Sequence, residues 1–440
     1  IYVSYTINMS NRYLQLNPAN IPPNQEISYK QGNPIVSFDI AESPSDLFGT
    51  SVRLCGNLTI TKDGTNPLTA ADTLYMDSRL GALGLFSDVV LSSQRTKQTI
   101  EHIRHYNRFM ASYLPMTASN QDLVGHIGEV ALTLPSLEAQ RTSVVNEGNI
   151  ANSGEFCIYL PTGLLNSGKG IPLDMLGGLT IDLHLAPDSQ VLFDSVGDAV
   201  ASGLSNAQYK LTNLKLQCEV HDRSPDEQAA AQKQAMAGFE YNSISSYYST
   251  LNNSNAILNY SLGLSRVDSV FMNFVPSSYL QNLNQNSLQT INPITSTGAL
   301  ANVDQIVFTR GGVRFPENFN LDTNFKEDPT ISQPVDPQVY RNFVNSILPF
   351  SEMNRNQISP VNLNREYTTN DNGTLLGGQT FGVGVSYSNI SGVDGADFSR
   401  TNWGVQLTLG LTDDNPISAF VFVHAKNTLL FGQGGIQVIS

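Results

Sequence analysis

Hydrophobic and polar residues alternate along many short stretches of this chain, and no other feature limits its fold so strongly. A period of two places every second side chain on one face of an extended segment, so each stretch predicts a half-buried β-strand. The alternating apolar positions are Val52, Leu54, Leu58 and Ile60; Leu179, Ile181, Leu183 and Leu185; Leu214, Leu216, Cys218 and Val220; Val405, Leu407, Leu409 and Leu411; Phe420 and Phe422; and Ile436 and Val438. The 440 residues include 42 Asn, 34 Gly and 21 Pro, which favour turns between strands. The sequence therefore predicts an all-β protein of antiparallel sandwiches.

Three stretches depart from this alternation and predict helices. The clearest covers residues 225–237, where Ser224 can cap the N-terminus, Glu227 can return the capping bond and Gly238 can end the helix. It lies near the midpoint of the chain, where a connector between two domains is expected. The other two predicted helices cover residues 101–116 and 336–350.

These two helical stretches resemble each other. Aligned at Tyr106 and Tyr340, with a constant offset of 234 positions, both read Tyr-x-x-Phe-x-x-Ser-x-Leu-Pro. A second pair of stretches, residues 178–188 and 404–414, shares its alternation at an offset of 226. We interpret the chain as a tandem duplication of one domain. The alternative is two unrelated β domains with chance similarity.

Each copy then has about 200 residues, with roughly eight strands and one helix midway. Eight strands in two packed sheets make a jelly roll. We therefore expect two tandem eight-stranded antiparallel jelly rolls, a double jelly roll with a few short helices. The expected divisions are an N-terminal arm at residues 1–33, a first jelly roll at 34–222, a connecting helix at 223–238 and a second jelly roll at 239–440.

Long polar stretches without alternation lie at residues 141–154, 277–299 and 318–337. Long excursions from a compact β scaffold often contact partners or substrates. We therefore expect charge reversal of Asp322 or Glu327 to disturb assembly more than folding.

Three further segments carry a family resemblance: residues 100–108 (Ile-Glu-His-Ile-Arg-His-Tyr-Asn-Arg), residues 171–187, which begin Ile-Pro-Leu-Asp-Met-Leu-Gly-Gly, and residues 209–220. In sequence, order and spacing they resemble the major capsid proteins of polinton-like viruses, adintoviruses and virophages. The resemblance spans residues 34–440, and the second half matches by architecture more than by residues.

The resemblance implies a vertical double jelly roll that forms a homotrimer, a pseudo-hexameric capsomer of an icosahedral shell around double-stranded DNA. The implied partners are neighbouring capsid trimers, penton proteins and minor capsid or cementing proteins. The implied location is the virion, after synthesis inside the host cell. It implies no catalytic, cofactor-binding or metal-binding residues, and the sequence is silent on an internal membrane.

Charge argues against a nucleic-acid-binding surface. The formal net charge is −14, charged residues make up only 14% of the chain, and no two Lys or Arg residues are adjacent. Direct neutralisation of phosphates requires clustered cations. The single Arg310-Gly311-Gly312 stretch predicts a turn, so we expect no direct specific nucleic-acid binding.

A glycine-rich stretch at residues 163–170, Gly-Leu-Leu-Asn-Ser-Gly-Lys-Gly, nearly matches a phosphate-binding loop. Gly170 stands where that loop has its metal-binding Ser or Thr, and Pro172 and the following strand leave no helix N-terminus for the phosphates. We interpret the stretch as a turn.

Other chemical motifs are equally incomplete. His102 and His105, three residues apart on a predicted helix, are two metal ligands without a third, and the remaining histidines, His126, His184, His221 and His424, are scattered. The cysteines, Cys55, Cys157 and Cys218, predict small core residues rather than a disulfide framework. Residues 432–435 predict a glycine-rich hairpin. We therefore expect no enzyme, metal or cofactor, although a catalytic carboxylate pair stays open among 38 acidic residues.

Two other function classes remain as alternatives. A two-domain β-sandwich could bind carbohydrate or act on glycosides, but the single tryptophan, Trp403, opens a strand-like run where core or interface packing is expected. A receptor-binding spike normally has a fibre or heptad repeat, and none is visible. The six Asn-x-Ser/Thr sequons of this Asn-rich chain do not indicate a compartment.

Overall fold

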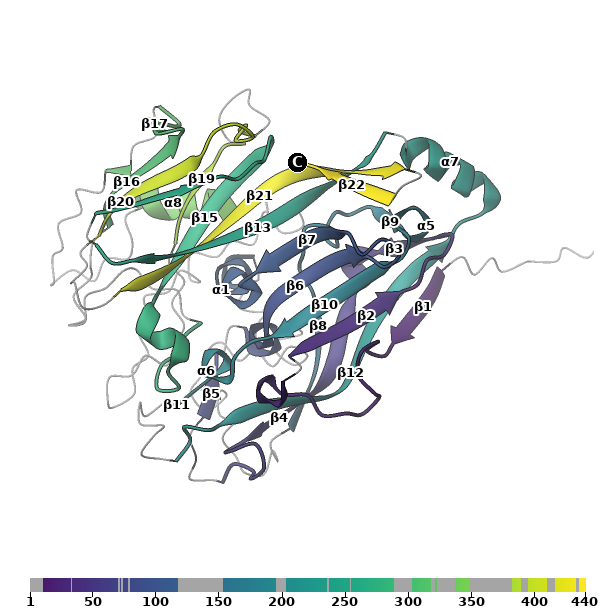
Figure 1. Ribbon diagram of the computed structural model, residues 1–440, viewed down its shortest axis with the longest axis horizontal. Coiled ribbons are helices and arrows are strands. Elements are labelled where there is room, and N and C mark those ends of the chain that lie inside the picture. Colours follow the sequence, from purple (N-terminus) through teal and green to yellow (C-terminus); the bar gives the residue numbers. More distant parts are fainter. Residues whose placement is uncertain are drawn as a thin grey trace, which may run out of the picture.

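The computed structural model describes residues 11–32, 34–69, 72, 74–77, 80–117, 153–194, 203–235, 237–253, 255–288, 303–317, 321–322, 337–347, 382–388, 395–409, 416–432 and 435–440. Strands dominate and form two sandwiches, one from each half of the chain (Figure 1). The short helices are η1 (Tyr29–Gln31), η2 (Gly49–Ser51), η3 (Gly81–Leu85), α5 (Leu173–Leu176), α6 (Asp188–Val191) and η4 (Ser277–Gln281).

The first sandwich has two antiparallel sheets. One sheet has the order β1 (Asn11–Leu16), β12 (Gln208–Asp222), β4 (Arg53–Thr61) and β8 (Ser153–Tyr159). On the same edge of β12 as β4 lies β3 (Ser45–Phe48), which pairs with β9 (Gly170–Pro172). The other sheet has the order β2 (Ile35–Ile40), β10 (Leu179–Leu185), β6 (Phe86–Ser93) and β7 (Thr99–Arg104). A small separate sheet pairs β5 (Leu74–Met76) with β11 (Leu192–Asp194).

The second sandwich repeats this plan. One sheet has the order β13 (Phe239–Leu251), β21 (Ile417–Gly432), β15 (Val267–Pro276) and β19 (Val383–Ser386), and β22 (Gly435–Ile439) pairs with the end of β21. The other has the order β14 (Asn255–Tyr260), β20 (Trp403–Leu409), β16 (Val303–Arg310) and β17 (Val313–Arg314), and β18 (Leu321–Asp322) also pairs with β16. In both sandwiches successive strands pass between two facing sheets, which is jelly-roll topology.

The predicted alternation is confirmed in the strands that form the walls of the first sandwich. Leu54, Leu58 and Ile60 of β4 are at most 1% exposed, while the residues between them are half-buried or small. Val36 and Phe38 of β2 are fully buried in the same core from the facing sheet. The hydrophobic period of each strand therefore decides which face joins the core.

The predicted duplication also agrees with the structure. The sequence stretches that matched each other form β10 and β20, each the second strand in the order of its sheet. The matching helical stretches form α1 (Tyr106–Thr117) and α8 (Pro337–Ile347). Each helix follows a strand of that sheet, β7 or β18, and precedes the edge strand of the other sheet, β8 or β19, so the two helices occupy equivalent places in the chain.

The first of these helices is shorter than predicted. Residues 101–104 belong to strand β7, which pairs with β6, and the helix begins only at Tyr106. His105, between them, has a positive φ of 55°, which turns the chain from strand to helix. The prediction of one helix from residue 101 was wrong because Ile100 and Ile103 fit the core of the sheet, a long-range contact that local spacing does not reveal.

The expected N-terminal arm needs a second correction. β1 pairs with β12 from Asn11↔His221 to Leu16↔Leu216, so residues 11–16 form an edge strand of the first sandwich. The prediction missed this strand because most of its side chains are exposed, including Tyr13 at 67%. An edge strand with little burial has no clear hydrophobic period.

The predicted connecting helix forms α7 (Pro225–Ala235), between β12 and β13. Its capping box is present, since Glu227 accepts the Ser224 N–H at 2.7 Å and the Glu227 N–H donates to Ser224 Oγ at 3.4 Å. Figure 1 shows this helix at the outer end of the molecule, away from the contact between the sandwiches. Over the described residues, no helix has the length and apolar character required to cross a bilayer.

Candidate functional site

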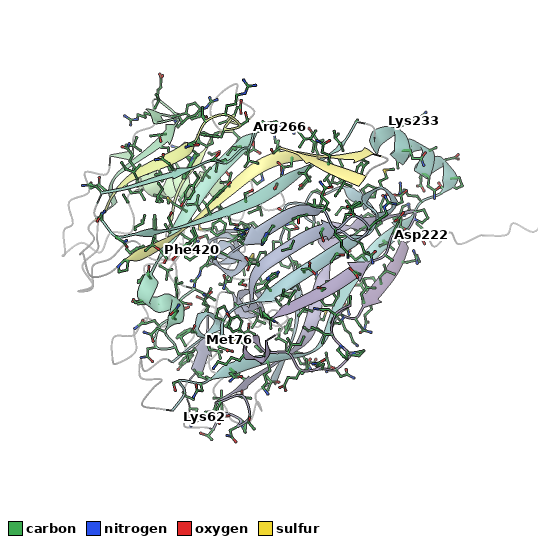
Figure 2. The ribbon with its side chains drawn as sticks, viewed as in Figure 1. Lys62, Met76, Asp222, Lys233, Arg266 and Phe420 are labelled. Atoms are coloured by element: carbon green, nitrogen blue, oxygen red, sulfur yellow. The ribbon has the colours of Figure 1, made fainter. Side chains whose placement is uncertain are left out.

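The two sandwiches meet through the sheet that contains β15 and β21. Residues 267–275 of β15 and 417–425 of β21 are all buried, because this sheet has an apolar layer on each face. Val421 and Val423 point into the core of the second sandwich, whereas Phe420 and Phe422 join the core of the first. Figure 2 places Phe420 between the sandwiches. We call this contact region the junction.

Aromatic side chains from both halves fill the centre of the junction. Phe109 of α1 lies 6.2 Å from Phe271 of β15 and 5.6 Å from Phe422 of β21, measured between ring centroids. Phe343 of α8 also contacts this cluster, with its ring centroid 6.1 Å from that of Phe271. Phe109 and Phe343 are the matching phenylalanines of the sequence repeat, so the duplicated motif brings its two copies together around one side chain.

Glu101 of β7 joins the halves through hydrogen bonds. Its carboxylate accepts the N–H of Gly163 at 3.1 Å and of Leu164 at 3.0 Å, both in the first sandwich, and the N–H of Ile244 at 2.9 Å, in β13 of the second. The side chain is only 3% exposed, and burial raises its pKa to about 7 while the three N–H donors oppose that rise. Tyr241 strengthens the contact by donating its hydroxyl to the Ile100 carbonyl at 2.9 Å.

The glycine-rich stretch at residues 163–170 takes part in this contact. Two of its first backbone N–H groups bind the Glu101 carboxylate, an anion supplied by the protein itself. A Cβ on Gly163 would lie 1.9 Å from the Asn242 carbonyl oxygen, so only glycine allows β13 to approach so closely. Gly168 has a φ of 68°, as a turn requires. The stretch is a turn, as predicted. The sequence did not indicate that this turn lies at the junction.

A second buried polar group on the first sandwich completes the junction. Arg108 of α1 is 1% exposed, donates to Ser287 Oγ at 3.3 Å and lies over the Phe420 ring at 5.4 Å. Burial lowers its pKa to about 9. Asn273 of β15 donates to the Arg108 carbonyl at 2.9 Å and to Ser112 Oγ at 2.8 Å. Sequence reasoning missed Glu101 and Arg108 as contact residues, because other polar and charged residues stand between them and no local signal marks their burial.

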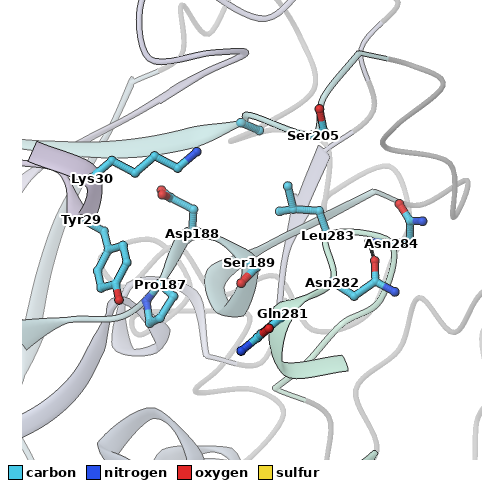
Figure 3. A pocket seen from close by; sticks show the side chains of 11 residues that line it. Tyr29, Lys30, Pro187, Asp188, Ser189, Ser205, Gln281, Asn282, Leu283 and Asn284 are labelled. Carbon is cyan, nitrogen blue, oxygen red and sulfur yellow. Dashed lines mark hydrogen bonds between the residues drawn. The ribbon is translucent and has the colours of Figure 1, made fainter. Parts of the chain in front are cut away.

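A pocket of about 330 Å³ is lined by residues from both halves of the chain (Figure 3). Its lining includes Tyr29 and Lys30 of η1, Asp188 of α6, and residues 281–284 of the second sandwich. Asp188 accepts the Tyr209 N–H at 3.0 Å, and burial raises its pKa to about 6 against the opposing charge of Lys30. Figure 3 shows no stack of aromatic rings there, and Tyr29 is the single aromatic side chain of the described lining.

The tryptophan that could have served a sugar site is in the core. Trp403 is fully buried, donates its indole N–H to the Tyr387 hydroxyl at 3.0 Å and stacks on Tyr260 at 6.1 Å. The expectation of core packing is confirmed, and Trp403 offers no exposed platform to a sugar ring.

The prediction that His102 and His105 lie on one helix was wrong. His102 is on β7, 3.9 Å from Asp88, while His105 packs on Tyr248 and Phe420. His126 lies outside the described residues. Among the residues that the structure describes, no three His, Cys, Asp or Glu side chains gather as a metal site would require.

The prediction for the cysteines was partly wrong. Cys218 is a buried core residue, but Cys55 and Cys157 are only half-buried and lie opposite each other on β4 and β8. Their side chains are on the outward face because Leu54 and Ile158, their neighbours along the strands, point into the core. The sequence could not show this pairing, because it depends on the register of two distant strands.

The remaining predicted features are ordinary turns where the structure describes them. Gly311 and Gly312 have positive φ angles and join β16 to β17, and Gly432 pairs with Gly435 in the β21–β22 hairpin. Asp322 lies in β18, whereas Glu327 and most of the long stretches at 141–154 and 318–337 lie outside the described residues.

Comparison with known proteins rests on structure alone. No family model matches the sequence, and no curated protein matches it. The major capsid protein of Faustovirus is similar, with a TM-score of 0.57 and 10% identity over 96% of this chain and 90% of that one. VP54 of PBCV-1 gives a TM-score of 0.56 and 14% identity over 100% and 98%, and the mavirus major capsid protein gives 0.52 and 12% over 100% and 92%.

The chain is a double jelly roll. These similarities extend over nearly all of both chains, so they include both sandwiches. The predicted fold class is confirmed, and the similar structures are of the kind that the sequence resemblance implied.

Proposed function

We propose that this protein is a viral major capsid protein, a structural subunit without a catalytic step. The observation that supports this most strongly is the full-length similarity to VP54, which covers 100% of this chain and 98% of that one. A likeness over a single jelly roll would fit lectins equally well, but a fixed pair of jelly rolls fits a shell subunit.

The proposed assembly is a homotrimer. Three copies of a duplicated domain present six similar units, which approximates a hexagonal tile. A rigid junction serves such a tile, since relative movement of the two jelly rolls would spoil its outline. We further propose the division at α7, with the first jelly roll before it and the second after it.

The proposed partners are neighbouring trimers, penton proteins and minor capsid or cementing proteins, in the shell of a virion around double-stranded DNA. Synthesis inside the host cell belongs to the same proposal. The net charge of −14 supports a shell that encloses a genome without binding it directly.

Electron microscopy of the purified protein tests the proposal. We expect negatively stained particles with a hexagonal outline and three-fold averages that show six lobes, or closed shells. Single two-lobed particles at every concentration would contradict it. Binding to a glycan array by such particles would instead support the carbohydrate-binding alternative.

A further inference from the structure

Two of the three cysteines are positioned to react with each other. The antiparallel register of β4 and β8 places Cys55 directly opposite Cys157. Opposed residues in such a pair have Cβ atoms about 4.5–5.5 Å apart, and a disulfide needs about 3.5–4.5 Å. Both side chains lie on the same outward face of the sheet, so they are direct neighbours across the strand pair.

Both cysteines lie near the edge of a sheet, Cys157 in the edge strand β8 and Cys55 in its neighbour β4. Cys55 and Cys157 are half-buried on the outward face of the first sandwich, whereas Cys218 is fully buried. β8 pairs only with β4 among the described strands of that sheet. An edge strand can adjust by the small distance that closure requires, and a small reagent can reach its outward side chains.

We infer that Cys55 and Cys157 are the site of a reversible cross-strand disulfide, formed by exchange with a small external disulfide such as oxidised glutathione. The thiolate of one cysteine bonds to one glutathione sulfur and expels the other glutathione as a thiolate. The thiol of the second cysteine then loses its proton, attacks the protein sulfur of this mixed disulfide and expels the second glutathione thiolate.

The exchange is balanced. Two protein thiols are oxidised to one disulfide, one oxidised glutathione is reduced to two glutathione thiols, and the two protein protons end on those thiols. The new bond ties edge strand β8 to β4, just before the turn that binds Glu101 at the junction. This chemistry does not depend on the proposed function. In a virion that leaves a reducing cell interior, it would strengthen each subunit after assembly.

The test is to incubate the full chain with oxidised glutathione, quench with acid, unfold it and alkylate free thiols without reductant. We expect an intact mass about 2 Da below that of the reduced chain before alkylation. Of the three cysteines, only Cys218 should be alkylated. Digestion should yield a pair of peptides joined by a disulfide between Cys55 and Cys157. The oxidised protein should also melt about 5–10 °C higher, because the bond closes a long loop.

Matched variants make the result specific. Cys218→Ser should still form the bond, whereas Cys55→Ser and Cys157→Ser should each stop at a mixed disulfide with glutathione. Far-UV circular dichroism checks that each variant folds. Three alkylated cysteines in the treated wild-type chain would overturn the inference, as would a lasting mixed disulfide in place of the internal bond.

Discussion

The core of the second sandwich and the junction between the sandwiches are both buried, but they differ in chemistry. The second core is largely apolar and aromatic, and the indole of Trp403 has its hydrogen bond to Tyr387 inside it. The junction combines an aromatic cluster with the charged groups Glu101 and Arg108 and the amide of Asn273. One region stabilises a domain and the other connects two domains.

This difference has a physical reason. Apolar burial is strong but not directional, so an apolar contact alone allows two sandwiches to slide over each other. A buried carboxylate that accepts three N–H groups loses them when either side moves, and leaving such groups unpaired is costly. We therefore expect the aromatic cluster to supply most of the free energy of the junction, and Glu101 to fix the relative placement of the halves.

The largest expected effect separates the two regions directly. Phe109→Ala, at the junction, and Phe308→Ala, in the second core, should each cost about 3–5 kcal/mol because each removes a fully buried ring. Only Phe109→Ala should split the calorimetric unfolding transition in two, since it loosens the halves from each other. Two unfolding transitions for Phe308→Ala, or a single transition for Phe109→Ala, would contradict the distinction between the second core and the junction.

One part of the pH dependence of stability should come from Glu101 at the junction. The folded-state pKa of Glu101 is raised to about 7, above its ordinary value of 4.5, so folding favours the protonated form. This contribution is complete below about pH 4.5 and is lost as the pH rises through 7, a difference of about 3 kcal/mol. Between pH 4.5 and 8 the denaturation midpoint of the wild type should fall relative to that of Glu101→Gln, because Gln does not titrate. Parallel curves would remove Glu101 as a source of the pH dependence.

Replacement of Glu101 tests its contacts at fixed pH. At pH 5, Glu101→Ala should cost about 2–3 kcal/mol, because three buried N–H groups lose their acceptor. Glu101→Gln keeps one side-chain oxygen and should cost less. Urea denaturation checks both variants, and equal stability of the two would mean that the hydrogen bonds do not matter.

The smallest effect concerns the close approach at Gly163. Gly163→Ala should cost about 1–2 kcal/mol, since its Cβ would overlap the Asn242 carbonyl and displace β13. Gly432→Ala, with 3.7 Å to its nearest atom, is the matched control and should change the melting temperature little. Equal melting temperatures for both variants and the wild type would show that β13 is free to move away from the turn.

Much of the fold follows from local sequence, and the rest depends on contacts between distant segments. Alternation along β4 and β10 and the repeated helix motif predicted two jelly rolls, because burial on one face leaves a readable period. The alternation assigned to Phe420 and Phe422 did not show that the residues beside them, Ala419, Val421 and Val423, are buried as well, because β21 is buried on both faces. Register is equally invisible locally, so neither the Cys55–Cys157 pair nor the Glu101 contact with β13 could be derived from spacing.

The mass of the purified chain in solution, measured by light scattering, tests the proposed capsid role most directly. The account predicts a trimer, near three times 47.9 kDa, at micromolar concentration. A stable monomer of 47.9 kDa that does not associate at any concentration reached would contradict it.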